Sequence, residues 1–146
     1  MINKMEYSIA KTYDEVLTAF TKLKSAFFDF NGEIESFAEK IYTNGFCIVC
    51  KEEDTAGLIA FYANDYDTNT AYITSLLVDK KCRGMGIATE LVQRVESICF
   101  ANGFKQVKLE VNKANLPAIS LYEKLGYKSD SEKEESIYMC KDLEVD

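Results

Sequence analysis

The sequence predicts a mixed α/β fold, with a central sheet of about six to seven strands and helices on both of its faces. Apolar residues recur at helical spacing over residues 12–27 and 33–42, and three strand-like runs follow between residues 46 and 78. Because polar turns separate these runs, they predict an antiparallel meander. The order then changes to helix, strand, helix and strand, which predicts one parallel pair of strands.

The N-terminal elements are predicted from their start and stop signals. Residues 7–10 predict a short first strand. Thr12 followed by Glu15 is a capping-box pattern, and it begins a helix with Val16, Leu17, Phe20, Leu23 and Phe27 on its apolar face. A second helix is expected over residues 33–42, ended by Asn44-Gly45. The strands of the meander are expected at residues 46–51, 56–63 and 71–78.

The C-terminal elements follow a loop that begins after Asp79. A helix with Ile87, Leu91, Val95 and Ile98 on one face is expected to end near Asn102-Gly103. A strand over residues 106–111 and a helix over residues 116–125 come next, followed by a strand at 137–141 and a shorter one at 127–128. No repeat or linker interrupts the chain, so residues 1–146 are expected to form a single domain.

Composition and charge limit the classes of function. The chain is 47% hydrophobic and 28% charged, as is typical of globular proteins, and no apolar run approaches the roughly 20 residues that cross a bilayer. The first residues lack the apolar segment of a signal peptide, so a cytoplasmic location is expected. The net charge of −7, from 17 basic and 24 acidic residues, disfavours nucleic-acid and membrane-surface partners and leaves room for a cationic small substrate.

Five cysteines include one C-x-x-C pair, Cys47 and Cys50. No second pair follows, and the chain has no histidine, so we expect no metal site. The pair lies in a strand-like run, which would direct the two side chains to opposite faces. Free thiols in a reducing compartment are therefore the expectation.

The segment from Leu76 to Leu91 combines the end of a strand, a loop with two glycines and the start of a helix. Such a loop directs several backbone N–H groups and a helix N-terminus toward one point, where an anion can bind. Gly84 and Gly86 allow positive φ, and Arg83 adds a positive charge. The loop is not the dinucleotide fingerprint G-x-G-x-x-G, because position 89 is Thr.

Two segments resemble those of a known family. Arg83, Gly86 and Ala88 fit the form Arg/Gln-x-x-Gly-x-Gly/Ala, so the loop resembles the acetyl-CoA pyrophosphate loop of the GNAT acetyltransferase superfamily. Residues 109–127 (LEVNKANLPAISLYEKLGY) are similar to the family's strand, Asn-x-x-Ala helix start and Leu-Tyr-Glu-Lys-x-Gly-Phe/Tyr ending. Their Leu-Glu-Val and Leu-Tyr-Glu-Lys-Leu-Gly-Tyr portions also resemble bacterial enzymes that acetylate the N-terminus of a ribosomal protein.

The resemblance implies acetyl transfer from acetyl-CoA, the acyl-donor substrate, to a primary amine by direct attack in a ternary complex. It also implies that the strands at 71–78 and 106–111 splay apart and that pantetheine lies between them. Asn115 would contact pantetheine, and it is equally suited to cap the next helix. The donor-binding residues implied are Leu76, Leu77, Val78, Arg83, Gly84, Met85, Gly86, Ile87, Ala88, Thr89 and Asn115.

Two residues are implied to be catalytic. Tyr122 matches the family's common general acid, which would protonate the departing thiolate, although a helix tyrosine packed into the core is the alternative. Glu110 matches a proposed base, and its alternatives are a solvent-facing strand residue or a ligand of the acceptor's ammonium group. Ser75 and Thr74 are placed to order a relaying water instead.

The sequence leaves the acceptor open: it is a small molecule or a peptide N-terminus. The first two helices and the loops at residues 64–70 and 129–135 are expected to select it, and a homodimer is compatible with the sequence. A non-catalytic acyl-CoA sensor is the alternative function. A missing general acid or an interrupted phosphate loop would favour a sensor, and the sequence has neither. A dinucleotide-dependent oxidoreductase is disfavoured by the missing third glycine.

Overall fold

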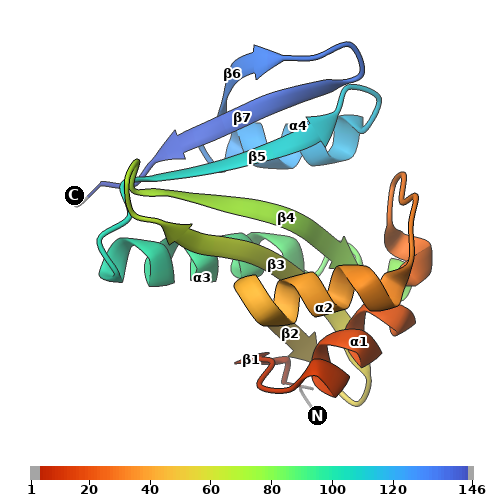
Figure 1. Cartoon of the computed structure of the whole chain (residues 1–146). Helices are drawn as coiled ribbons and strands as arrows, with labels where there is room; N and C mark the ends of the chain where they lie inside the picture. Colours follow the sequence, from red (N-terminus) through yellow and green to blue (C-terminus); the bar gives the residue numbers. More distant parts are fainter. Residues whose placement is uncertain (1–3, 145–146) are drawn as a thin grey trace.

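The computed structural model describes residues 4–144 (Figure 1). Residues 1–3, at the start of the segment considered for a leader peptide, and residues 145–146, at the end of the expected domain, lie outside this range. Within it, seven strands form one sheet in the order β1-β2-β3-β4-β5-β7-β6. The pair β4–β5 is parallel and the other pairs are antiparallel, which confirms the mixed sheet predicted from the sequence.

The elements follow the predicted order. The strands are β1 (Glu6–Ile9), β2 (Phe46–Lys51), β3 (Thr55–Asp65), β4 (Thr70–Val78), β5 (Gln106–Asn112), β6 (Lys128–Glu132) and β7 (Ser136–Asp142). The helices are α1 (Tyr13–Lys22), α2 (Ile34–Asn44), α3 (Ile87–Ala101) and α4 (Leu116–Lys124), with short 3₁₀ helices η1 (Lys24–Ala26) and η2 (Lys80–Cys82).

Helix α1 starts as predicted and ends early. Thr12 Oγ1 accepts a hydrogen bond from the Glu15 N–H at 3.1 Å, and this bond satisfies a free donor of the first turn. The predicted continuation to Phe27 is wrong, because the helix ends at Lys22 and is followed by η1. Phe27 remains packed on the same helix, since its ring stacks on that of Phe20 with centroids 6.0 Å apart. Phe27 therefore fits the helical spacing of apolar residues because it packs against α1, although its own backbone is not helical.

Helices cover both faces of the sheet (Figure 1). Helices α1 and α2 bury their apolar residues against one face, and α3 and α4 pack on the other. Strand β3 is buried between these layers: Leu58 and Ala60 face α1 and α2, whereas Ile59 and Phe61 face α3. A strand covered on both sides needs a continuous apolar run, which explains why its sequence does not alternate.

A polar contact ties α3 to the far end of the sheet. Tyr127, which is 2% exposed, donates a hydrogen bond to Glu96 Oε2 on α3 at 2.8 Å. The other carboxylate oxygen, Glu96 Oε1, accepts from Lys141 Nζ on β7 at 3.0 Å. Tyr127 is thus a core residue between α4 and β6, and the predicted strand at 127–128 is corrected to Lys128–Glu132.

The C-x-x-C pair is divided between the two cores, as predicted. Cys47 packs in the cluster of α1 and α2, and Cys50 packs in the cluster of α3. All five cysteines are free thiols, and burial raises the pKa of Cys47 to about 12. Residues 4–144 contain no group of three or more His, Cys, Asp or Glu that could hold a metal ion.

Candidate active site

A β-bulge at Thr74 opens a gap in the sheet. Ala60 pairs with Ser75 and Phe61 pairs with Ile73, so Thr74 is an extra residue in β4. The insertion reverses the alternation of side chains: Ile73 packs on the α3 side, whereas Leu77, four residues later, packs on the α1 side. Bulges bend a strand and increase its twist. The parallel pairing of β4 with β5 accordingly ends at Ile73, opposite Leu109, and the two strands then diverge (Figure 1).

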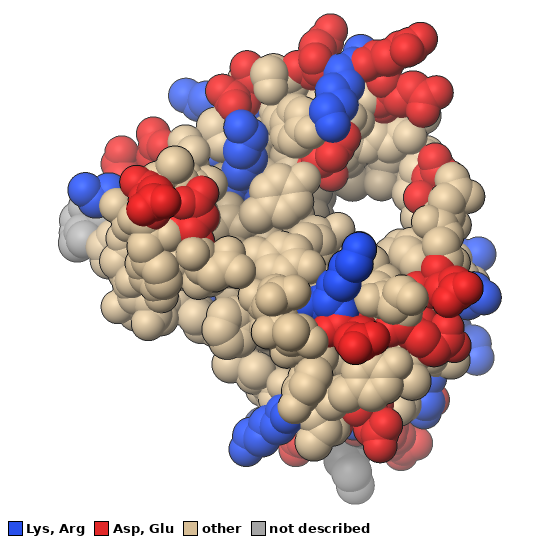
Figure 2. Space-filling view, in the orientation of Figure 1, with Lys and Arg blue, Asp and Glu red and all other residues tan. Residues whose placement is uncertain are grey.

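The gap holds two adjoining cavities. The loop cavity, of about 650 Å³, lies beside residues 80–89, and the strand cavity, of about 490 Å³, lies between the diverging ends of β4 and β5. An opening passes between the α1–α2 connection and the C-terminal half of the molecule (Figure 2). Both cavities are lined by Ala26, Phe27, Phe28, Leu76, Asn115 and Ala118, so they form one continuous groove.

The loop cavity has the features of an anion site. Gly84 and Gly86 have φ of 81° and 79°, and a Cβ atom at either position would have no neighbour within 4 Å. These glycines are therefore required by backbone conformation, with open space beside them. Gly86 is the N-cap of α3 and supplies no side chain, so the N–H groups of the first turn stay available. Lys80 and Arg83 also line the cavity, which has no acidic residue among its described lining residues.

Most residues predicted to bind the donor meet at this groove. Leu77 lines the strand cavity. Met85 lines neither cavity, and it is 58% exposed. Its side chain is therefore not placed to make the predicted contact with the donor. The residues that line the loop cavity are Leu76, Val78, Arg83, Gly84, Gly86, Ile87, Ala88, Thr89 and Asn115.

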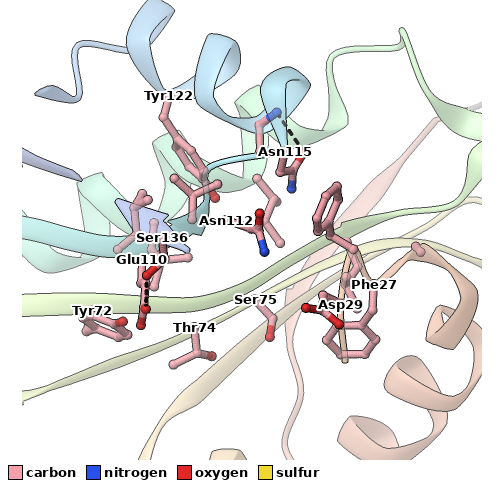
Figure 3. A pocket seen from close by; sticks show the side chains of 18 of the residues that line it. Phe27, Asp29, Tyr72, Thr74, Ser75, Glu110, Asn112, Asn115, Tyr122 and Ser136 are labelled. Carbon is pink, nitrogen blue, oxygen red and sulfur yellow. Dashed lines mark hydrogen bonds between the residues drawn. The ribbon is translucent and has the colours of Figure 1, made fainter. Parts of the chain in front are cut away.

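Asn115 has the capping role predicted for it and also borders the groove. Its side-chain oxygen accepts a hydrogen bond from the Ala118 N–H at 3.3 Å, which caps α4 (Figure 3). The residue lines both cavities at their junction. Because only the oxygen is engaged by the helix, the side-chain NH₂ group remains able to donate toward the groove.

Tyr122 points from α4 into the strand cavity (Figure 3). Its side chain is 5% exposed and packs edge-on against the Tyr127 ring, with centroids 5.5 Å apart. Burial raises the pKa of Tyr122 well above the usual value near 10, so the phenol stays protonated at neutral pH. Among residues 4–144 its hydroxyl has no hydrogen-bond partner, and it is therefore free to donate to a bound molecule.

Glu110 lies across the strand cavity on β5 (Figure 3). Its Oε2 accepts a hydrogen bond from Ser136 Oγ at 2.5 Å, and Lys133 Nζ lies 3.8 Å from the same oxygen. The side chain is 35% exposed. Burial of the neighbouring Tyr72 and, as a smaller cause, the charge of Glu110 raise the pKa of Tyr72 to about 12. Glu110 is thus a fixed carboxylate that still faces the cavity.

Thr74 and Ser75 complete the opposite wall of the strand cavity. Thr74 Oγ1 donates to the Ala60 carbonyl at 3.2 Å. Ser75 is 8% exposed and lies between Glu110 and the α1–α2 connection (Figure 3). Either hydroxyl has a lone pair that can order a water in the cavity.

The structure adds lining residues that the sequence patterns did not identify. Phe27, Phe28 and Asp29 belong to the α1–α2 connection, and Ser136 is the first residue of β7. Asn31-Gly32 is the turn signal that would have located the first of these segments.

The two loops expected to select the acceptor differ in their position relative to the cavities. The loop at residues 64–70 lies at the end of β4 that pairs with β5, away from the gap, and lines neither cavity. Of residues 129–135, Ser129–Glu132 belong to β6, and only Glu135 lines the strand cavity.

No helix in the described range is both long and apolar enough to cross a bilayer.

Comparison with protein families gives a match over most of the chain. The model of the acetyltransferase (GNAT) family matches residues 10–127. An N-acetylaspartate synthetase of Danio rerio is 29% identical over 103 residues, which cover 70% of this chain and 36% of that protein. The N-alpha-acetyltransferase MAK3 of Arabidopsis thaliana is 42% identical over 60 residues, which cover 41% and 32% of the two chains. This chain therefore matches only about a third of the length of these relatives.

Solved structures agree with the fold. The ribosomal-protein-S18-alanine N-acetyltransferase of Escherichia coli superposes with a TM-score of 0.79 at 18% identity, covering 97% of this chain and 96% of that one. The PaiA N-acetyltransferase of Thermoplasma acidophilum, solved with coenzyme A, gives a TM-score of 0.73 at 19% identity and covers 94% and 99% of the two chains. At these identities the likeness concerns the fold alone.

Proposed function

Because this chain belongs to the acetyltransferase (GNAT) family, we propose that it transfers an acetyl group from acetyl-CoA to a primary amine. The observation that carries the proposal is the junction of the two cavities. An anion site with two basic residues adjoins a second cavity that holds a buried, protonated and unpartnered phenol among the described residues. The groove between them would hold a long donor with phosphates at one end and a reactive thioester at the other.

Both backbone groups and side chains contribute to the proposed donor site. We propose that the first turn of α3, together with Arg83 and Lys80, binds the pyrophosphate. Beyond Ile73, β4 has no strand partner on the β5 side within residues 4–144, so its free peptide groups can pair with the amides of pantetheine. Asn115 NH₂ would donate to the same arm. The donor-binding set proposed is the predicted one, with Met85 contributing its backbone.

Two side chains are proposed to move protons. The Tyr122 hydroxyl would donate its proton to the departing thiolate, since it is neutral and free at neutral pH. Glu110 would accept the proton of the attacking ammonium, directly or through a water ordered by Ser75. An amine with a pKa near 10.4 is neutral only about once in a thousand molecules near pH 7.4, so this step matters for the rate.

Transfer is proposed to be direct, without an acetylated cysteine. Burial raises the pKa of Cys99 to about 11 and also raises that of Cys50 and Cys140, so these thiols are poor nucleophiles. We therefore expect a ternary complex, whereas ping-pong kinetics with an acetylated cysteine in the mass spectrum would contradict it. Free thiols also suit the cytoplasm, and we propose that the chain acts there as a single-domain enzyme. Whether it forms a homodimer, as the sequence allows, would be measured by gel filtration.

The test is the release of free coenzyme A from acetyl-CoA in the presence of a panel of amines, with acetyl-CoA binding measured separately by calorimetry. We expect micromolar binding and amine-dependent release. Binding without release for any amine would favour the non-catalytic sensor, and absence of binding would contradict the proposal as a whole.

A further inference from the structure

The two cavities have opposite charges, and this difference bears on the acceptor. The loop cavity is lined by Lys80 and Arg83 and, in the described chain, by no acidic residue. The strand cavity is lined by Asp29, Glu110 and Glu135 and, within the same range, by no lysine or arginine. A ligand that lies along the groove therefore meets positive charge at one end and negative charge at the other.

The strand cavity also contains polar groups that indicate a ligand independently of its carboxylates. Tyr122 is 5% exposed and Ser75 is 8% exposed, and both side chains line the cavity. Within residues 4–144 neither hydroxyl has a hydrogen-bond partner on another residue. Because no side-chain oxygen of the described residues is both fully buried and without a partner, the two hydroxyl oxygens must be accessible from the cavity, where a bound polar molecule can hydrogen-bond to them.

The three carboxylates are held on separate elements around this cavity. Asp29 lies in the α1–α2 connection, on the opposite side of the cavity from Glu110 on β5 (Figure 3). Glu135 belongs to the turn before β7, where its carbonyl accepts from the Lys113 N–H at 2.9 Å. Of the three, only Glu110 pairs with a basic side chain of residues 4–144: Lys133 Nζ lies 3.8 Å from its Oε2. Asp29 and Glu135 therefore keep their charges available.

We propose that the acceptor is a small amine with a second positive charge, such as an aliphatic diamine. This inference rests on the proposed function and specifies its acceptor. The reacting amine would lie near Tyr122 and Glu110, and the second ammonium group would be held by Asp29 and Glu135 at the mouth of the cavity. An acceptor with a carboxylate, such as an amino acid, would meet repulsion from both residues, since like charges at this range oppose binding.

Three probes of nearly equal length test the charge requirement: butane-1,4-diamine, butan-1-amine and 4-aminobutanoic acid. They differ only in the group at the far end, which is positive, neutral or negative. The diamine should show a kcat/KM about tenfold above that of the monoamine, and the amino acid should fall about tenfold below it. The advantage of the diamine should shrink as salt is raised, because screening weakens the attraction of exposed charges.

Charge-neutral variants assign the effect to the two residues. The double variant Asp29→Asn/Glu135→Gln should lose most of the preference for the diamine over butan-1-amine. The matched control is Glu33→Gln/Glu134→Gln, which removes the same charge from neighbouring positions that line neither cavity. The control should retain the preference, which separates a local effect from the change in net charge.

Calorimetry of the three probes against the CoA-saturated protein gives a readout that does not require turnover. Diamine binding that is lost in the first double variant, without acetyl transfer to any probe, would show a diamine site at these carboxylates but contradict both the proposed function and the diamine as its acceptor. Acetyl transfer to butan-1-amine or 4-aminobutanoic acid as fast as to the diamine would overturn the inference and leave the proposed function standing.

Discussion

Tyr122 combines three properties that suit the proton donor proposed here: its ring is buried, its hydroxyl is protonated, and the hydroxyl has no protein partner in the described chain. Tyr122→Phe keeps the ring and its contact with Tyr127 but removes the donor. We expect kcat to fall about 10²- to 10⁴-fold, or about 3–5 kcal/mol of barrier, with acetyl-CoA affinity nearly unchanged. Steady-state kinetics and calorimetry measure the two effects. A folded Tyr122→Phe protein with the original kcat would show that Tyr122 only packs.

Glu110 is tested through the pH dependence of its variant. Glu110→Gln keeps the size of the side chain and its contact with Ser136 but removes the proton acceptor. We expect a loss of about 10²-fold near pH 7 that shrinks toward pH 9.5, because more of the amine is then neutral without help from a base. A pH-independent defect in the rate profile would indicate that Glu110 binds the amine and that a water near Ser75 acts as the base.

The sequence located these two residues better than it located their surroundings. Tyr122 and Glu110 lie in regular elements whose spacing determines their faces, so a motif was enough to predict that they would lie near the gap. Asp29 and Glu135 lie in connections whose path depends on distant packing, such as that of Phe27 on Phe20. No local pattern distinguishes these carboxylates from the solvent-exposed ones around them.

At the scale of elements, the loop before α3 gives a test of donor binding. Gly86 has a φ of 79°, so any other residue there is strained by about 1–2 kcal/mol. Gly86→Ala introduces this strain alone, and Gly86→Glu adds bulk and a negative charge beside the first turn of α3. We expect calorimetry to give an acetyl-CoA affinity at least about tenfold weaker for Gly86→Glu than for Gly86→Ala. Equal affinities would mean that the pyrophosphate lies elsewhere.

The elements were predictable to the extent that local chemistry determines them. Thr12 with Glu15 identified the start of α1, and Asn115 identified that of α4. The bulge at Thr74 was not predicted, because the run from Ala71 to Val78 has nothing that marks an inserted residue. The bulge becomes visible only when Ala60 and Phe61 on the neighbouring strand are paired with it.

At the scale of the whole molecule, the buried tyrosines limit stability in alkali. Burial raises the pKa of both Tyr122 and Tyr127 above that in the unfolded chain, so the folded state holds these protons longer. Their contribution to the free energy of unfolding is fully present below pH 10, the usual pKa of tyrosine, and is lost as the pH rises above that value. At pH 11 the two residues together should lower the free energy of unfolding by about 3 kcal/mol, which urea titrations at pH 8, 10 and 11 would measure.

The control for this prediction uses one tyrosine inside the core and one outside it. Tyr122→Phe should reduce the alkaline loss at pH 11 by about 1.5 kcal/mol, because one buried phenol no longer titrates. Tyr66→Phe, at a position that is 65% exposed, should leave the pH dependence unchanged. If the two variants behave alike, the loss comes from other groups.

The parallel contact between β4 and β5 spans only four residue pairs, from Thr70–Gln106 to Ile73–Leu109. A donor that pairs with β4 would act as the missing strand of the sheet. In hydrogen-exchange terms, the amides of residues 74–78 that face the gap should exchange readily in the free protein and slow markedly with coenzyme A bound. The amides of Thr70 to Ile73 that face β5 should be protected in both states, so the boundary of ligand-induced protection would fall at the bulge.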